Sequence, residues 1–244
     1  MKFDDIDDPR RDFLVKALTA GAFAMGSNGL IAPVWAMGKI PKIIPPGKSI
    51  FDLSGRVTVN NMAADLDTFI SPGDVVETSA SSHAVFVVGK DAFILRSNSR
   101  MEIEGSTIIN TIRLFSGRVL SVFGRRPAKN KLTMRTTTAT IGIRGTGVYM
   151  EADPEKTYLC TCYGETELVS NSDKNIRQRI AATHHDAPKY ILAKGSRNKI
   201  IQPAPMINHT DDELMLIEEL VGREVPFGLE GDEYKGPRKG YDKY

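Results

Sequence analysis

The feature that most constrains this 244-residue chain is a series of short segments, between residues 51 and 168, in which apolar and polar residues alternate. Glycine, proline and aspartate separate the segments. They are 57–59, 83–88, 92–95, 101–103, 108–115, 118–123, 131–138, 147–151 and 157–162. Period-two alternation is typical of strands, and none of these segments has the three-and-four spacing of a helix. Many short strands at regular intervals predict a mainly β fold, a sandwich or roll closed by hairpins.

Glycines punctuate two of these segments in ways that predict local structure. Pro72-Gly73-Asp74 suits a tight turn, because proline presets one torsion angle, glycine accepts a positive one and aspartate bonds the backbone. In the segment 138–149, Gly142, Gly145 and Gly147 lie among β-branched residues, where glycine marks a bulge or a close backbone approach. The alternative is an anion cradle, but no Gly-Lys-Ser/Thr closes this segment and no helix follows.

These motifs resemble those of a FecR domain. The similar stretches are 51–59, 70–78, 81–88, 114–119 and 138–149, with Gly73, Asp74, Gly142, Arg144, Gly145 and Thr146 as the structural positions. The resemblance implies a jelly-roll-like β domain over residues 49–169, located in the bacterial envelope. FecR regulators also have a cytoplasmic anti-sigma segment and a membrane helix. No segment after Ala36 is able to span a bilayer, so we expect a free-standing envelope module without direct control of transcription.

The first 36 residues predict export. Arg10, Arg11, Phe13 and Leu14 are in register with the twin-arginine signal, which they resemble, although Pro9 replaces its leading hydroxyl residue and Val15 is inserted before the lysine. The apolar run that follows is too weak for a membrane span and ends at Ala36, a plausible cleavage point. The alternative is an ordinary amphipathic helix. We expect a periplasmic or secreted protein that uses the twin-arginine translocase, with a proline-rich linker over 37–48.

Cysteines and histidines form a candidate metal site. Cys160 and Cys162 are two residues apart on a predicted strand, so both sulfur atoms point to the same face. Their Cα atoms would be about 6.6 Å apart, at the long limit for a disulfide. Two thiolates could instead bind a transition metal such as zinc, with His184, His185 and His209 as further candidate ligands. The alternative is a pair of inert core cysteines or a strained disulfide.

The region 170–229 is predicted to be an extension with one helix. Thr210 and Glu213 form a capping box, and apolar residues at helical spacing continue to Gly222, which predicts an amphipathic helix over 211–221. This helix should pack on the β domain. Residues 230–244 have no periodicity and are expected to be a flexible tail.

Composition and motifs exclude several functions. A net charge of +2 without a basic stripe does not favour nucleic-acid binding. The adjacent pair Arg125-Arg126 is expected to be a solvated turn. There is no Gly-x-Ser-x-Gly elbow and no His-Glu-x-x-His motif, so the sequence does not predict an enzyme. We expect an exported, non-catalytic binding, sensing or scaffold protein whose partner is an envelope protein or a polymer. The alternative is a metal-binding or redox protein that uses Cys160 and Cys162.

Overall fold

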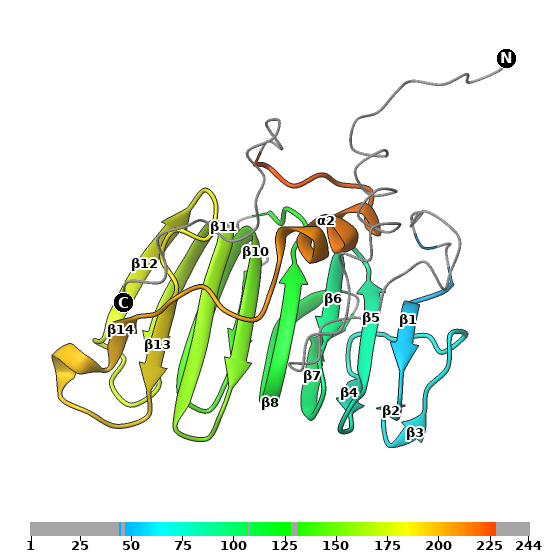
Figure 1. The fold of residues 1–244 in the computed structure, drawn as a ribbon, viewed down its shortest axis with the longest axis horizontal. Coiled ribbons are helices and arrows are strands. Elements are labelled where there is room, and N and C mark those ends of the chain that lie inside the picture. The colour runs from blue at the N-terminus through cyan, green and yellow to red at the C-terminus, as the bar shows by residue number, and fades with distance from the viewer. Residues whose placement is uncertain (1–43, 45–46, 107, 128–130, 228–244) are drawn as a thin grey trace, which may run out of the picture.

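The computed structural model describes residues 44, 47–106, 108–127 and 131–227. Within these residues, fourteen strands form one continuous hydrogen-bonded sheet, which confirms the mainly β prediction (Figure 1). The twin-arginine motif, Ala36 and the tail lie outside the described residues. In the described part of the chain, no helix is both long and apolar enough to cross a lipid bilayer.

The sheet folds over into two layers, and the first layer carries the candidate site. Its strands pair in the order β1, β5, β6, β8, β10, β11, β13 and β14. Their bounds are β1 Ile50–Ser54, β5 His83–Val88, β6 Asp91–Leu95, β8 Ile109–Val122, β10 Ala139–Ala152, β11 Lys156–Ser170, β13 Lys189–Leu192 and β14 Ile201–Pro203. All these neighbours are antiparallel. The strands missing from this order belong to the second layer.

The second layer is built from short strands and the remaining halves of the long ones. It runs in the order β3, β2, β4, β7, β8, β9, β10, β11 and β12. The new members are β2 Val57–Val59, β3 Met62–Ala63, β4 Val75–Thr78, β7 Ser99–Gly105, β9 Leu132–Arg135 and β12 Arg177–Ala182. Strands β8 and β9 pair in parallel, whereas the other pairs are antiparallel.

Three long strands, β8, β10 and β11, belong to both layers. β8 pairs with β7 up to Ser116 and with β10 from Gly117 onward, so it changes layer at this point. β10 crosses at an irregularity between Arg144 and Gly147. At Gly117 the φ angle is +88°, a left-handed value that residues with a Cβ adopt at a steric penalty. A Cβ there would also overlap Ser99. The sequence therefore places glycine where the chain bends between layers.

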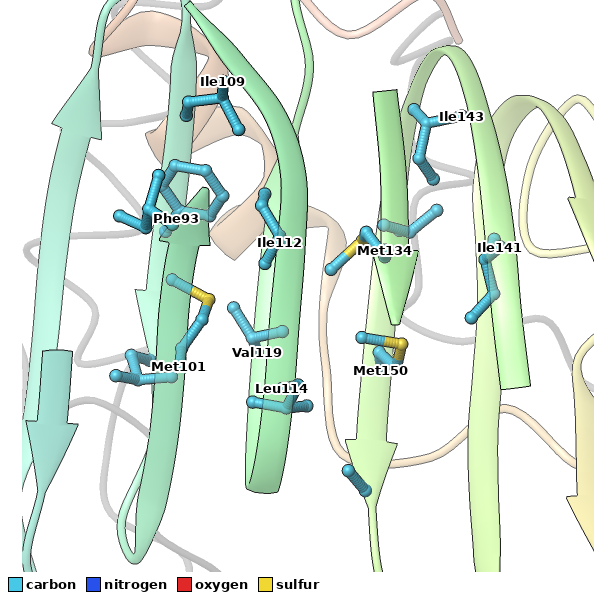
Figure 2. Packing of buried hydrophobic residues seen from close by; sticks show 14 of the residues in the cluster. Phe93, Met101, Ile109, Ile112, Leu114, Val119, Met134, Ile141, Ile143 and Met150 are labelled. Carbon is cyan, nitrogen blue, oxygen red and sulfur yellow. The ribbon is translucent and has the colours of Figure 1, made fainter. Parts of the chain in front are cut away.

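The main core lies between the two layers. Side chains that alternate with outward-facing ones meet there, as Phe93, Met101, Ile112 and Met134 show in Figure 2. All four are completely buried. Removing a side chain of this size from water contributes about 1.5–3 kcal/mol, so this apolar layer is the principal source of stability.

A second apolar cluster lies on the outer face of the first layer. Val85, Ile94 and Leu120 belong to this face, and the alternation of β5, β6 and β8 turns them away from the main core. Residues 204–227, which we call the C-terminal cover, lie over them and include helix α2 (Asp211–Glu219). Figure 1 shows the cover running from β14 across the sheet to α2, which contacts β8 and β6. Strand β6 and residues 119–122 of β8, in the middle of the first layer, are therefore buried on both faces.

The structure differs from the sequence prediction in several places. Residues 108–115 and 118–123 were predicted as two strands but form the single strand β8. The glycine-rich segment lies inside β10, which begins at Ala139 and not at Gly147, and the predicted irregularity is present between Arg144 and Gly147. Strands β12, β13 and β14 continue the sheet beyond residue 169, where the sequence predicted an extension with one helix. That helix forms with its capping box but ends at Glu219.

Candidate metal centre

Cys160 and Cys162 lie on β11, on the outer face of the first layer. Because one residue separates them, both sulfur atoms point toward the C-terminal cover, as period-two alternation predicts. Both residues have 0% exposure, and both are free thiols. The sequence left a metal site, a disulfide and inert thiols open, and the structure does not form the disulfide.

His185 lies in the loop between β12 and β13, directly beside Cys160. The carboxylate of Asp186 accepts hydrogen bonds from the backbone of Thr183 and His184, which folds this loop tightly. The backbone N–H of His185 donates to the carbonyl of Cys162 at 2.9 Å. Its Nδ1 is 3.3 Å from Cys160 Sγ. The loop thus brings an imidazole from 25 residues away onto the thiol pair.

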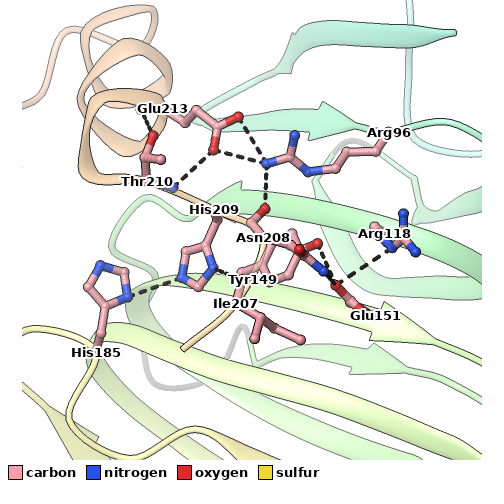
Figure 3. Close-up of polar contacts among 10 residues, drawn as sticks. All are labelled: Arg96, Arg118, Tyr149, Glu151, His185, Ile207, Asn208, His209, Thr210 and Glu213. Atoms are coloured by element: carbon pink, nitrogen blue, oxygen red, sulfur yellow. Dashed lines mark hydrogen bonds and ion pairs between the residues drawn. The ribbon is translucent and has the colours of Figure 1, made fainter. Parts of the chain in front are cut away.

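His209 comes from the C-terminal cover and completes the group. Its Nδ1 donates to the carbonyl of Ile207 at 2.6 Å, which leaves Nε2 without that proton and facing His185 Nδ1 at 3.1 Å. The ring stacks on Tyr149, with the two centroids 4.5 Å apart and the planes 15° apart. Two fixed contacts therefore orient His209 toward the site (Figure 3).

Asp211 supports two histidines from the start of helix α2. Its carboxylate oxygens are 2.7 Å from His184 Nε2 and 2.8 Å from His185 Nε2. Because an ionised carboxylate only accepts hydrogen bonds, His185 carries a proton on Nε2 and directs Nδ1 to the thiols. Burial disfavours the carboxylate, but the two histidine hydrogen bonds outweigh it and lower the pKa of Asp211.

The four groups, Cys160, Cys162, His185 and His209, lie close enough together to bind one metal ion. Their ligand atoms lie within 4.8 Å of one another, and no residue is more than 4% exposed. Bond lengths of about 2.3 Å to sulfur and about 2.05 Å to nitrogen give tetrahedron edges of about 3.3 Å for N···N and about 3.5 Å for S···N. The N···N distance of 3.1 Å and the S···N distance of 3.3 Å are each slightly shorter.

Electrostatics in the group favour a thiolate. Burial alone would raise the pKa of Cys160, but the hydrogen bond from Cys162 and the adjacent histidines lower it well below its usual value. Burial raises the pKa of Cys162. For His185, burial opposes the charge, yet hydrogen bonds to Asp211 and Cys160 raise the pKa to about 9. A proton on His185 beside the Cys160 thiolate thus occupies the position that a cation would take.

The same residues also line up as a nucleophile, a base and a carboxylate. Cys160, His185 and Asp211 have the order of a cysteine-dependent triad. A nucleophile has to reach its substrate, however, and Cys160 is fully buried beneath the C-terminal cover. Metal ligation, which needs no access for a substrate, fits this burial better.

His184, also predicted as a ligand, is separate from the thiol pair. It contacts Asp211, and it forms a second group of metal-ligand type only with His185 and Asp211. Sequence reasoning did not identify Asp211 as part of the site. The capping box made it an ordinary acidic residue in the first turn of a helix, and only the packing of α2 brings it to the histidines.

The motif residues of the FecR resemblance are placed away from this centre. Gly73 has a φ angle of +107°, and Asp74 accepts from the Ser71 backbone at 2.7 Å, which forms the predicted turn. Gly142 and Arg144 lie on β10, beside the crossing at Gly145, and the Thr146 hydroxyl donates to the Tyr163 carbonyl. These contacts are structural.

One further expectation about an arginine pair is wrong. The sequence indicated that Arg125-Arg126 is a solvated turn, but Arg126 donates to the buried carboxylate of Asp91 at 3.0 Å. Asp91 also accepts from the backbone of Gly124. Arg126 is therefore a structural residue, whereas Arg125 is exposed as expected.

Comparisons with known proteins give only a distant similarity. A scan against protein-family models and a search of curated proteins found no match. Two crystal structures of a "putative anti-sigma factor" from Parabacteroides distasonis, at 1.65 and 2.50 Å resolution, are similar to this chain at a TM-score of 0.43 and 12% sequence identity. The similarity covers 53% of this chain and 58% of those chains, so the chain spans little more than half of their length. The FecR resemblance stays a prediction.

Proposed function

We propose that this protein binds one transition-metal ion through Cys160, Cys162, His185 and His209. The observation that carries the proposal is the close approach of two thiols and two imidazole nitrogens, all within 4.8 Å and all buried. Each imidazole has its second nitrogen fixed by a carboxylate or a carbonyl, as metal-ligating histidines commonly have. This is the alternative function that the sequence left open, now with a specific set of ligands.

Zinc is the metal that this ligand set favours. Two thiolates and two imidazoles in tetrahedral arrangement are typical of Zn²⁺ sites. Four protein ligands leave no position for water or substrate, which is the pattern of structural or regulatory sites and not of hydrolytic ones. A closed site of this kind agrees with a non-catalytic binding or sensing protein.

Export in the folded state is the second part of the proposal. The twin-arginine route accepts folded passengers, so a metal bound in the cytoplasm could be carried to the periplasm inside its site. Cell fractionation and N-terminal sequencing of the mature protein test this part. Uncut protein retained in the cytosol would refute it without affecting the metal site.

Metal analysis of the full-length protein tests the site. The protein should be purified without a histidine tag and without chelators, and mass spectrometry of the elements should find one zinc equivalent per chain. Cys160→Ser and Cys162→Ser should each lose the ion, and His209→Ala should bind it much more weakly. His83→Ala is the matched control, because His83 pairs with Asp52 outside the site.

A further variant separates the two groups of candidate ligands. His184→Ala should retain the metal if the thiols bind it, whereas loss in His184→Ala with retention in Cys160→Ser would place the ion at His184, His185 and Asp211. Replacement by Co²⁺ adds a spectroscopic test, because thiolate-to-cobalt charge-transfer absorption should be weakened in each cysteine variant. Metal-free wild-type protein that takes up no added zinc would refute the proposed function.

A further inference from the structure

The candidate metal centre is divided between two parts of the molecule. Cys160, Cys162 and His185 belong to the sheet and its β12–β13 loop. His209 belongs to the C-terminal cover, and so does Asp211, which holds His185 in position. An ion bound by all four ligands would therefore join the cover to the sheet.

The cover contributes much of the apolar packing on the outer face of the first layer. Leu214 and Ile217 from α2, and Leu220 at its C-cap, are buried against the sheet, in one cluster with Ile94 and Leu120. Helix α2 has nine residues, which is too short to be stable alone in water. Its formation therefore depends on docking to this face.

Polar contacts hold the cover close to His209, and Figure 3 shows them converging there. Arg96 donates to the carbonyl of Asn208 at 2.8 Å and to both oxygens of Glu213 at 2.9 Å. The side chain of Asn208 donates to Glu151 at 2.7 Å. Every one of these contacts joins the sheet to residues 208–213, so the ligand His209 is placed by the same docking that forms α2.

This docking includes groups that are costly to bury. Arg96 is 2% exposed, and its Nε and Nη1 have no hydrogen-bond partner among the residues that the structure describes. Unsatisfied buried donors oppose folding, because each loses its hydrogen bonds to water. The ion pair with Glu213 offsets this only in part, because desolvation of two buried charges can exceed their attraction. The apolar packing of the cover offsets these costs, and an ion that binds only the docked cover would add to that stabilisation.

We propose that the metal ion is a clasp that controls the docking of the C-terminal cover, so that loss of the ion frees residues 204–227 and uncovers the outer apolar face of the sheet. The inference rests on the proposed metal site and adds its regulation. Binding and docking are then reciprocal: whatever opens the cover weakens the metal, and whatever removes the metal opens the cover.

The size of the effect follows from linkage. An ion that binds only the docked form lowers the equilibrium constant for opening of the cover. The factor is 1 + [M]/Kd, where [M] is the concentration of free metal. At free metal about 100 times Kd, opening of the cover should fall about 100-fold. The protection of cover amides against hydrogen exchange should rise by the same factor and in proportion to the free metal concentration.

Hydrogen exchange on the full-length protein, with zinc alone as the ligand, tests the clasp. In metal-free protein we expect the amides of Leu214 in α2 and of Leu220 at its C-cap to exchange well before those of Val76 and Met101 in the second layer. Zinc should then slow the α2 amides about 100-fold at about 100 times Kd. Equal protection of α2 with and without bound zinc would overturn the inference while leaving the proposed function intact.

A second outcome would also overturn it. If α2 and second-layer amides exchange together in metal-free protein, the cover opens only with global unfolding and no separate docking step exists. Absence of zinc binding to wild-type protein, in contrast, is the failure of the proposed function and is measured first, by stoichiometry.

Variants of the one ligand on the cover refine the test. In His209→Ala the three remaining ligands all lie on the sheet, so residual zinc binding should no longer change the protection of α2. His209→Cys, which restores a fourth ligand, should recover the dependence on zinc. His83→Ala is the control, and unchanged second-layer protection in each variant reports that the sheet is folded.

Discussion

Replacement of Asp211 by asparagine isolates the support that the cover gives to the metal ligands. The carboxylate of Asp211 accepts one hydrogen bond from His184 and one from His185, on separate oxygens. Asparagine has one acceptor oxygen, so its NH₂ group would face the proton on one of these histidines. If His185 changes tautomer to avoid this contact, its Nδ1 no longer offers a lone pair to the metal.

The expected loss in metal affinity is 10-fold to 100-fold, as is typical for removal of a carboxylate behind a histidine ligand. This corresponds to about 1.4–2.8 kcal/mol. The assay is competition for zinc with a chromophoric chelator of known affinity, at fixed pH and ionic strength.

Asp212→Asn is the matched control for this prediction. It removes a carboxylate from the same first turn of α2, and therefore the same interaction with the helix dipole. Asp212 is absent from both groups of candidate metal ligands, whereas Asp211 belongs to one of them. Equal zinc affinities for Asp211→Asn and Asp212→Asn would refute the reasoning, because the loss would then come from the helix and not from the histidines.

Three further predictions concern stability. Burial and two neighbouring carboxylates raise the pKa of Asp212 to about 6, so the charge of this residue opposes folding increasingly from pH 4 to 6. Asp212→Asn should therefore be more stable than wild type in urea denaturation at pH 8, and equal stability of the two proteins would contradict this. Gly117→Ala should lower the free energy of unfolding by more than about 3 kcal/mol, because of backbone strain and overlap with Ser99. Gly89 has a φ angle of +64° and open space around it, so Gly89→Ala should lower the free energy of unfolding by only about 1–2 kcal/mol; similar urea midpoints for both variants would contradict the geometry described at Gly117. Glu213→Gln should destabilise the protein by about 3–5 kcal/mol by leaving Arg96 buried without its counterion, and a change below about 1 kcal/mol in chemical denaturation would show that the pair is not buried in solution.

The strands of the fold could be predicted because alternation is a local property. Residues 83–88 and 92–95, with the turn between them, were identified from their own side chains, and so was the capping box at Thr210. The long strand β8 was missed because Gly117 looks like a break in the sequence. Only the neighbouring layer shows that the chain stays extended there and changes partners.

The candidate site was predictable in part for the same reason. Period two put Cys160 and Cys162 on one face, but no local rule could say which of three histidines would meet them. His185 arrives through the β12–β13 loop and His209 through the docking of α2, both of which are long-range events. Asp211 could not be assigned at all, because its role depends on where the helix packs.

Strands that serve both halves of the sandwich limit how this molecule can move. Since β8, β10 and β11 pass from one half to the other without interruption, neither half can slide or hinge without breaking backbone hydrogen bonds in three places. Large rearrangements of the two layers relative to each other would therefore require these hydrogen bonds to break. Conformational changes are therefore expected in segments that pack on the outside of the two layers, while the layers themselves stay rigid.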